Sequence, residues 1–306
     1  MRVVIDVAAR LTAPDLARSV DRLGFRGDDV AAVLGAAAVV SASEADLARV
    51  LTLATRLESS IGDFGPGPGN PLEHEASRAE HLGVGVLPLL ALLVTAPDVS
   101  GYHQERGISQ DVSTASLADL GQQAWVHRQT FGTFGLHTYW WLSLAWSGAL
   151  YRLGRLQFNL QQEDARWVLS THIPATGPLA PAAVDDAFTR AADFFARHFQ
   201  ELPTEDFHCA SWLLDPELAA ALDPASNIVH FQRRWQLYGE PMPGDHDALF
   251  FTFFRRGGVD LATLPQETSL QRAVVGRLRQ GRRWSVWQGR IPQSTFRIST
   301  TRIESP

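Results

Sequence analysis

The sequence predicts an α+β protein in which an all-helical N-terminal domain precedes a domain built on a mixed sheet. Apolar residues in the first half recur with the 3.6-residue period of helices. From Tyr151 onward, segments rich in β-branched and aromatic residues alternate with helical ones, as in a sheet with crossover helices. A length of 306 residues fits about two domains of roughly 150 residues. We therefore expect one domain at residues 1–147 and a second at residues 148–306.

Capping residues and glycines delimit the helices expected in the first domain. Thr12, Asp28 and Ser43 each precede a segment with apolar helical periodicity, as N-cap residues do. Residues 64–71 contain three glycines and three prolines, which predict a loop. Further helices are expected at residues 82–94, 117–131 and 136–150, with a turn at residues 96–101.

Residues 151–199 organise the second domain. Residues 153–160 and 167–173 have the residue pattern of two strands, and the polar segment 161–166 between them suits a hairpin connection. Residues 174–181 hold three prolines and one glycine, which exclude both a helix and a central strand. A helical period begins at Ala182, so the start of this helix offers backbone N–H groups and a positive dipole end to a phosphate.

The rest of the second domain is expected to complete a sheet of about six strands. Four further segments have strand-like composition: residues 206–214, 227–238, 248–254 and 284–291. Helices are expected at residues 216–222 and 269–281. The mixed order of strands and helices indicates an α+β or α/β sheet.

Composition excludes several classes of function. The net charge of −6 argues against general nucleic-acid binding, which favours a basic face. The sequence contains no lysine, so a Schiff-base or P-loop lysine mechanism is excluded. A single cysteine, Cys209, excludes an internal disulfide and suits the cytoplasm. The start of the chain lacks the apolar core of a signal peptide, and the apolar runs are too short to span a bilayer. We expect a soluble cytoplasmic protein without nucleic-acid or membrane partners.

Metal binding is not expected. His74 and His81 lie seven residues apart, with Glu73 and Glu75 beside the first, but no third ligand is in register with them. A solvated charged face explains the group. The GxSxG, HExxH and Walker motifs are also missing, so the enzyme classes that use them have no support.

Short motifs across residues 100–290 resemble those of a two-domain GNAT-like acyltransferase family. Its members carry a helical GNAT-like N-terminal domain and a GNAT-like C-terminal acyltransferase domain. The first 100 residues resemble the family only loosely. The motifs are YHQERGI at 102–108, YRLGRLQF at 151–158, HIP at 172–174, SWLL at 211–214, SNI at 226–228 and LPQETSLQRA at 264–273.

This resemblance implies a GNAT-like N-acyltransferase that uses acyl-CoA or another acyl thioester as co-substrate and needs no metal. In GNAT proteins the pantetheine lies between two central strands, and the pyrophosphate rests on the loop and helix start that follow the first of them. The matching pantetheine positions are Thr171 and Ile173. The matching pyrophosphate positions are Ala175, Thr176, Gly177 and Leu179.

The loop departs from the usual GNAT pattern, which presents several glycines and a basic residue. Residues 174–181 have one glycine, no basic residue and prolines that cannot donate an N–H. Arg233, Arg234 or Arg272 could supply the missing charge. An acyl carrier protein therefore stays an alternative thioester donor.

Two residues are candidates for the chemistry. His172 stands just before the loop, where it could act as a general base, and the alternative is a packed histidine in the sheet. Ser211 could protonate the leaving thiolate, and the alternative is an ordinary polar strand residue. Cys209 is expected to be buried in apolar surroundings rather than to act as a nucleophile.

The predicted reaction is direct attack by an amine or hydroxyl of a small-molecule acceptor on the thioester carbonyl. His172 would act as the base, and backbone N–H groups near Ile173 would polarise the carbonyl. Two alternatives stay open. One is a non-catalytic binding or regulatory module on the same fold, and the other is a thioester hydrolase that uses water as the acceptor.

Overall fold

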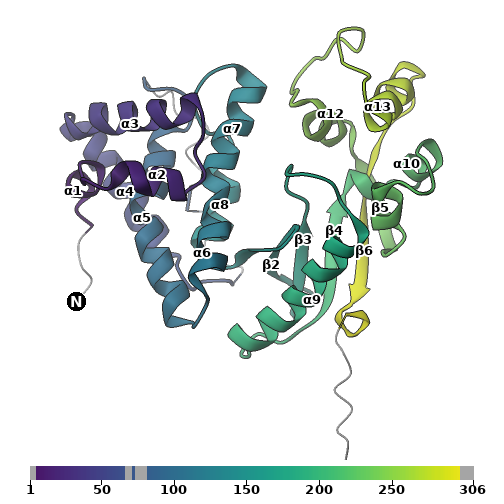
Figure 1. Cartoon of the computed structure of the whole chain (residues 1–306), viewed down its shortest axis with the longest axis horizontal. Helices are drawn as coiled ribbons and strands as arrows, with labels where there is room; N and C mark the ends of the chain where they lie inside the picture. Colours follow the sequence, from purple (N-terminus) through teal and green to yellow (C-terminus); the bar gives the residue numbers. More distant parts are fainter. Residues whose placement is uncertain (1–4, 66–70, 73–80, 297–306) are drawn as a thin grey trace, which may run out of the picture. The chain divides into compact units, whose positions relative to one another are not determined.

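The chain divides into two compact units, Met1–Arg152 and Leu153–Pro306. A computed structural model describes residues 5–65, 71–72 and 81–296. The first unit is helical and the second is a mixed sheet with helices, which confirms the predicted α+β class (Figure 1). The helices of the first unit are α1 (Val7–Leu11), α2 (Leu16–Arg22), α3 (Asp28–Ser41), α4 (Glu44–Ser59), α5 (Val86–Glu105), α6 (Gln110–Leu117), α7 (Asp119–Phe131) and α8 (Tyr139–Trp146).

Helix α5 forms the core of the helical unit. Leu89, Leu90 and Leu92 are fully buried there. By length and composition alone α5 could span a membrane, but 72% of its most apolar window is buried inside the protein, as in a core helix. The turn expected at residues 96–101 is wrong, because α5 continues through Pro97 to Glu105. Arg10 supports the helix beside Pro97: its Nη1 lies 2.5 Å from the carbonyl oxygen of Val94, and its guanidinium pairs with the Asp98 carboxylate.

Several predicted helix ends in this unit are also wrong. Thr12 does not begin a helix. It ends α1, where its hydroxyl donates to the Ala8 carbonyl at 2.8 Å. The helix expected at 136–150 ends at Trp146, and the chain is already in a strand at Leu150. Ser43 does cap α4, as predicted, by accepting a hydrogen bond from the Asp46 N–H. Most of the expected loop at 64–71 lies outside the described residues.

The second unit is built on a sheet with the strand order β1-β2-β3-β4-β6-β5, of which β1 starts in the last residues of the first unit. Strands β3 and β4 pair in parallel, whereas β2 with β3, β4 with β6, and β5 with β6 pair antiparallel. The strands are β1 (Leu150–Leu153), β2 (Leu156–Glu163), β3 (Arg166–His172), β4 (Thr204–Ser211), β5 (Gln236–Pro243) and β6 (Ser285–Pro292). The helices are α9 (Pro181–His198), α10 (Pro216–Ala221), α11 (Asn227–Gln232), α12 (Asp245–Phe253) and α13 (Ser269–Arg279).

Two predicted strands of this unit are wrong. Residues 227–232 form α11, whose N-cap Ser226 accepts a hydrogen bond from the Val229 N–H, and β5 begins only at Gln236. Residues 248–253 belong to α12, which starts after Gly244 and buries Ala248, Phe250 and Phe253. A short run that is almost wholly apolar has no clear period, so packing decides between helix and strand.

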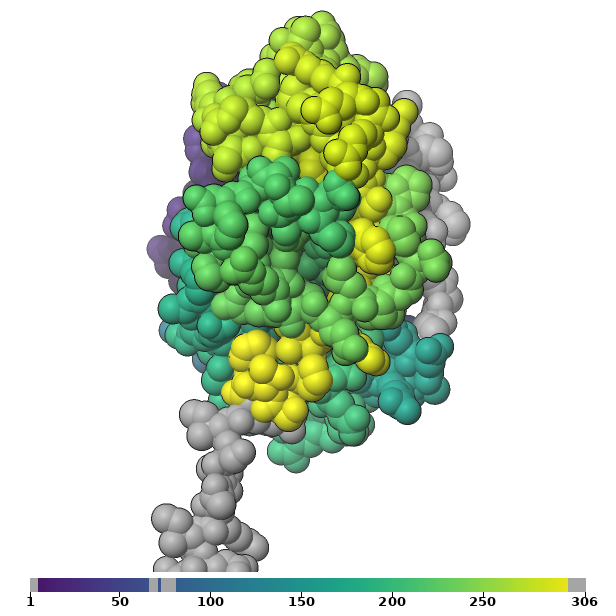
Figure 2. Space-filling view, turned by 90° about the vertical axis from the view of Figure 1, so that its right-hand side faces the viewer, coloured from purple at the N-terminus to yellow at the C-terminus, as the bar shows by residue number. Residues whose placement is uncertain are grey.

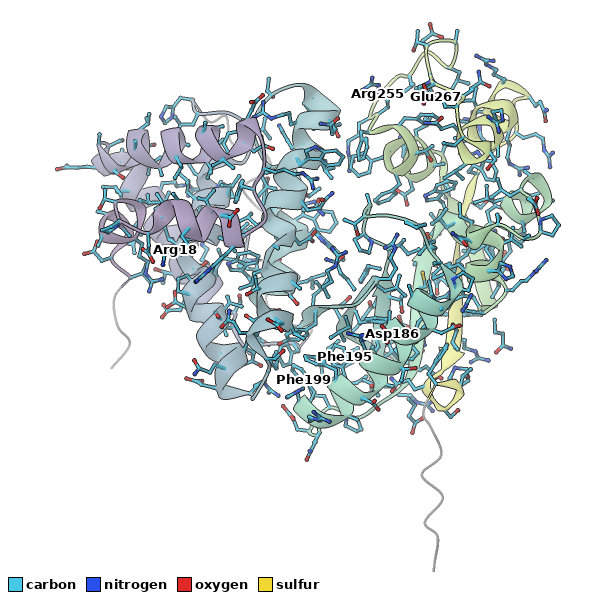
Figure 3. The ribbon with its side chains drawn as sticks, in the orientation of Figure 1. Arg18, Asp186, Phe195, Phe199, Arg255 and Glu267 are labelled. Atoms are coloured by element: carbon cyan, nitrogen blue, oxygen red, sulfur yellow. The ribbon has the colours of Figure 1, made fainter. Side chains whose placement is uncertain are left out.

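Helix α9 covers one face of the sheet with aromatic side chains. Its Phe188 lies 5.6 Å from Phe158 of β2 and 4.8 Å from Phe207 of β4, measured between ring centroids. Further along the helix, Phe195 packs against Phe199 (Figure 3). Because side chains alternate between the faces of a strand, Leu169 and Thr171 of β3 share this face.

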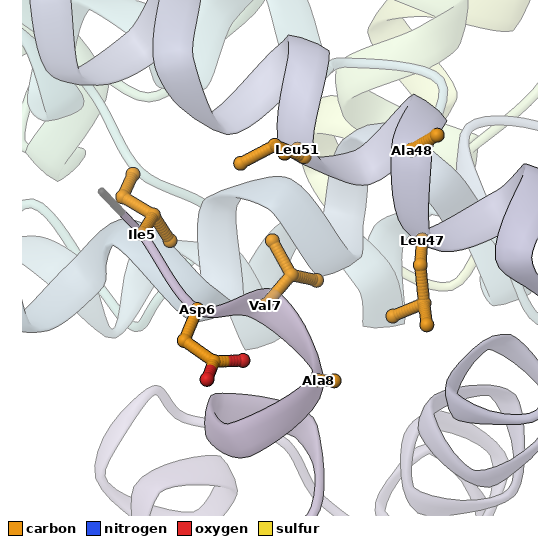
Figure 4. A pocket seen from close by; sticks show the side chains of 7 residues that line it. All are labelled: Ile5, Asp6, Val7, Ala8, Leu47, Ala48 and Leu51. Atoms are coloured by element: carbon orange, nitrogen blue, oxygen red, sulfur yellow. The ribbon is translucent and has the colours of Figure 1, made fainter.

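The helical unit has a hollow of its own near the chain start. This pocket of about 440 Å³ is lined by α1 and α4 residues that include Val7, Leu47 and Leu51 (Figure 4). Its one charged residue, Asp6, caps α1 by accepting from the Ala9 N–H at 2.9 Å. The pocket therefore offers no group suited to acyl transfer.

Candidate functional site

The two parallel strands at the centre of the sheet separate before they end. Their pairing runs from Trp167 with Thr204 to Ser170 with His208. Beyond that point β3 still pairs with β2 up to His172, and β4 still pairs with β6 up to Ser211. The two strands therefore open a wedge between them, and its apex lies at Ser170 and His208. Backbone groups that face the wedge are available to an extended ligand.

The mouth of the wedge is formed by the loop at residues 174–180 and the start of α9. Pro181 stands at the first helical position, where a missing N–H costs nothing. The backbone N–H groups of Gly177, Leu179, Ala182 and Ala183 make no hydrogen bond within the described part of the chain. Together with the helix dipole they suit an anion.

Arg155 reaches this loop from the tight turn between β1 and β2. Its guanidinium donates to three loop carbonyls: Nη2 to Gly177 at 2.7 Å, Nε to Pro178 at 2.9 Å and Nη1 to Pro174 at 3.1 Å. The turn itself depends on Gly154, whose φ of 70° favours glycine. A basic residue therefore does hold the loop, although the loop sequence contains none.

The face of the sheet opposite α9 is polar at the same edge. His172 Nε2 lies 2.6 Å from the side-chain oxygen of Asn159, and the Asn159 amide nitrogen donates to the Leu160 carbonyl at 2.9 Å. Since the amide oxygen only accepts, His172 carries its proton on Nε2 and its lone pair on Nδ1. Burial lowers the pKa of His172 to about 4. The imidazole is therefore neutral at neutral pH, and Nδ1 carries its lone pair.

Two buried polar atoms near the end of β3, one on each face of the sheet, have no hydrogen-bond partner. Gln157, the cross-strand neighbour of His172, is 3% exposed and its Nε2 is unsatisfied. Thr171 is 2% exposed and its Oγ1 is unsatisfied. A buried polar group without a partner costs about 1–3 kcal/mol, so both atoms favour a bound ligand that supplies one.

Ser211 lies at the end of β4, at the edge where the wedge opens. Its Oγ accepts a hydrogen bond from the Leu213 N–H at 3.1 Å and so caps a short 3-10 turn, Trp212–Leu214. Its hydroxyl proton can still be donated. Cys209 is buried, and burial raises the pKa of its thiol to about 12, so it is no nucleophile at neutral pH.

A second polar cluster lies on the same sheet face as His172. His208 Nδ1 lies 2.8 Å from a Glu163 carboxylate oxygen and 3.0 Å from the Tyr238 hydroxyl. Burial raises the pKa of Tyr238, with Glu163 as a further cause. The cluster joins β2, β4 and β5 across this face of the sheet, next to the apex of the wedge.

Of the three arginines considered for the loop, Arg234 reaches its end. Its Nη2 lies 3.3 Å from the Pro181 carbonyl oxygen, and its guanidinium pairs with Asp185 near the start of α9 at 2.8 Å. The other two lie elsewhere, and Arg233 is exposed. Arg272 lines a groove of about 270 Å³ between α10 and α13. Arg277 and Arg282 also line it, and both pair with Glu217. Figure 2 shows this face of the unit, with the yellow segment of α13 above the green segment of α10.

No cluster of metal-ligating side chains occurs among the residues that the structure describes. His81 lies within this set and pairs with Asp46 at 3.3 Å. Glu73, His74 and Glu75 lie outside it.

Sequence comparisons match both parts of the chain. A model of the N-acyltransferase N-terminal domain matches residues 14–148, and a model of the GNAT-like C-terminal domain matches residues 150–291. Among curated proteins, no match is found.

Solved structures resemble almost the whole chain. One is an acyltransferase in complex with decanoyl-CoA and teicoplanin, 34% identical, covering 90% of this chain and 87% of that chain with a TM-score of 0.79. Another is an acyltransferase in complex with CoA and 10C-teicoplanin, 33% identical, covering 92% of this chain and 88% of that chain with a TM-score of 0.81. A third is an acyltransferase in complex with decanoyl-CoA, 34% identical, covering 90% of this chain and 86% of that chain with a TM-score of 0.77.

Three residues of the site were missed in the sequence: Arg155, Gln157 and Asn159. All three lie in or just after the YRLGRLQF motif. In an antiparallel hairpin the start of β2 lies opposite the end of β3. This pairing alone places Arg155 near the loop, and Gln157 and Asn159 on one face near His172.

Proposed function

Because this chain belongs to the two-domain GNAT-like N-acyltransferase family and is an acyltransferase, we propose that its donor is acyl-CoA and its acceptor an amine or hydroxyl of a small molecule. The observation that carries the proposal is the separation of β3 and β4 beyond Ser170 and His208. It leaves an unpaired strand edge for pantetheine, directly ahead of a helix start suited to the pyrophosphate.

On the donor side, Thr171 and Ile173 lie along the wedge and offer polar groups to the pantetheine. Thr171 Oγ1, buried and unsatisfied, is suited to a pantetheine amide. The pyrophosphate would rest on the loop, where Ala175, Thr176, Gly177 and Leu179 stand, and on the first turn of α9. The neighbours with bound decanoyl-CoA support this class of donor.

On the acceptor side, His172 takes a proton while the acceptor attacks. The acceptor nitrogen or oxygen forms a bond to the thioester carbonyl carbon, the C–S bond breaks, and the proton of the acceptor passes to His172 Nδ1. Asn159 keeps that nitrogen unprotonated through its bond to Nε2. A backbone N–H near Ile173 stabilises the charge on the carbonyl oxygen. Ser211 is the proposed proton donor to the departing thiolate, and the proton taken by His172 then returns to the Ser211 oxygen through water, so that both side chains end as they began.

Gln157 is the proposed contact for the acceptor. Its unsatisfied Nε2 lies beside His172 on the polar face, where it can donate to an oxygen of the acceptor. The acceptor named for the neighbours, teicoplanin, is a small molecule rather than a protein. The free thiol of Cys209 and an acyl-CoA donor suit a cytoplasmic enzyme.

An acyl carrier protein is the second candidate donor. The arginine-lined groove between α10 and α13 offers positive charge to an acidic carrier. The groove lies near the start of β6, and β6 pairs antiparallel with β4, so it is at the same edge of the sheet as the wedge mouth.

The test combines a thermal-shift titration with a thiol-release assay. Ligands are CoA and acetyl-, octanoyl- and decanoyl-CoA, and a ligand that binds only the folded state raises the midpoint. Thiol is then measured with and without a panel of amine acceptors. Binding with acceptor-dependent thiol release supports the transferase. Release without an acceptor identifies a hydrolase, binding without release a binding module, and no binding of any CoA species rules out the CoA donor.

A further inference from the structure

We propose that Arg155 is the positioning residue for the pyrophosphate loop, so that one side chain from the β1–β2 turn replaces the glycine-rich sequence usual in GNAT loops. This inference rests on the proposed CoA-binding function and adds the residue that enables this loop to bind the pyrophosphate.

The first argument is stereochemical. In a trans peptide unit the C=O of one residue and the N–H of the next point in opposite directions. Arg155 binds the carbonyls of Pro174 and Pro178, at 3.1 and 2.9 Å. The N–H groups that follow them, on Ala175 and Leu179, therefore point away from the guanidinium. Neither makes a hydrogen bond within the described residues.

The second argument concerns the third carbonyl. The Gly177 carbonyl oxygen accepts a hydrogen bond from Arg155 Nη2 at 2.7 Å. A free carbonyl in the loop would repel a phosphate oxygen. By binding three carbonyls, Arg155 leaves the N–H groups of Ala175 and Leu179 on the side away from the guanidinium, whereas Pro178, which follows Gly177, has none.

The third argument is the geometry of the side chain. A guanidinium has five N–H donors in a rigid planar fork, whereas a lysine ammonium is a compact point charge. Three different nitrogens of Arg155 each bind a different carbonyl. A lysine at position 155 could not reproduce this arrangement, and the chain contains no lysine elsewhere.

The test compares two donors that differ in one part. Decanoyl-CoA carries the pyrophosphate and nucleotide, whereas decanoyl-pantetheine lacks both. Dissociation constants for both are measured by calorimetry with full-length wild-type protein, Arg155→Ala and Arg155→Lys. Because hydrogen bonds to charged groups are the strong ones, we expect Arg155→Ala to weaken decanoyl-CoA binding at least about tenfold. Decanoyl-pantetheine should bind as it does to the wild type.

Arg166→Ala is the matched control. Arg166 is exposed at the opposite end of β3, so this variant removes the same charge without touching the loop. It should bind both ligands as the wild type does. Arg155→Lys keeps the charge and should still weaken decanoyl-CoA binding.

Each other outcome has a definite reading. If the wild type binds no decanoyl-CoA, the proposed function fails. If the wild type binds it and Arg155→Ala binds equally well, the positioning role is wrong. Equal losses of affinity for both ligands would overturn it, because they would indicate a general structural role. Wild-type affinity of Arg155→Lys for decanoyl-CoA would also overturn it, because it would indicate a purely electrostatic role. If Arg155→Ala does not fold, Arg155→Lys decides alone.

Discussion

The two faces of the central sheet use the same strands for different purposes. On the α9 side, Phe158 and Phe207 pack against Phe188, and Thr171 is a polar residue on this otherwise aromatic face. On the opposite side, the very next residues along the strands are polar and lie near the wedge: Gln157, Asn159, Ser170, His172 and His208.

This difference shows how a sheet edge becomes a reactive site. The aromatic face fixes the strands in place through burial. The polar face then presents buried groups whose hydrogen-bonding capacity is only partly used inside the protein. We therefore expect substitutions on the aromatic face to change stability, and those on the polar face to change catalysis.

The largest effect on stability is expected for Phe188→Ala. Phe188 is fully buried and contacts four aromatic rings, those of Phe158, Phe207, Trp235 and Phe296. Truncation should lower the free energy of unfolding by about 3–5 kcal/mol, measured by urea denaturation. Phe251→Ala is the control. Because Phe251 is exposed, this substitution should lower the free energy of unfolding by less than about 1 kcal/mol. Similar losses in both variants would contradict the assignment of the core.

On the polar face, His172→Ala should reduce the rate of acyl transfer by about two or more orders of magnitude. Its affinity for decanoyl-CoA should stay close to that of the wild type, because the donor is held by the wedge and the loop. The measurements are thiol release and calorimetry. A rate within about threefold of the wild type would exclude His172 as the base.

Lowering the pH should destabilise the fold through buried histidines. Burial lowers the pKa of His103, His127 and His172 to about 4, against a usual value of about 6.5. Between about pH 6.5 and pH 4 the unfolded chain binds protons on these rings that the folded chain does not bind. Unfolding free energy should therefore fall as the pH drops through this window, by up to about 1.4 kcal/mol per pH unit for each histidine.

The check is urea denaturation between pH 7 and pH 4.5. Replacing His103 by Gln should reduce the slope with pH, whatever it does to stability at neutral pH. An unchanged slope would show that His103 binds protons equally in the folded and the unfolded chain, which would contradict its lowered pKa.

The smallest expected effect is that of Gln157→Leu on stability. Its Nε2 is buried without a partner, so a side chain of similar size without polar atoms should leave the free energy of unfolding within about 0.5 kcal/mol or raise it. Asn159→Leu is the contrast, since it removes bonds to His172 and Leu160 and should destabilise. A clear loss of stability in Gln157→Leu would mean that Gln157 is a structural residue.

The class of fold and the family were predictable because local signals agreed with global ones. The hairpin, the proline-rich loop and α9 follow from composition and periodicity around residues 151–199. The wrong elements lie where those signals are weak. Residues 248–253 are apolar except for Thr252, so only their packing against Trp212 and Trp284 in the second core settles a helix.

The site was less predictable than the fold, because its groups come together through strand pairing. Asn159 and His172 are 13 residues apart and meet only in the register of β2 and β3. Arg155 reaches a loop that begins 19 residues later in the chain. The sequence of residues 174–181 alone therefore does not reveal that the loop suits a phosphate.

Hydrogen-exchange mass spectrometry with and without decanoyl-CoA tests the central claim most directly, because it locates the donor. We predict slower exchange in peptides that cover residues 171–183 and 209–214, the two sides of the wedge and its mouth. Peptides of α13 should be unchanged. Protection confined to α10 and α13, or no protection at all in the presence of saturating ligand, would contradict a donor site between β3 and β4.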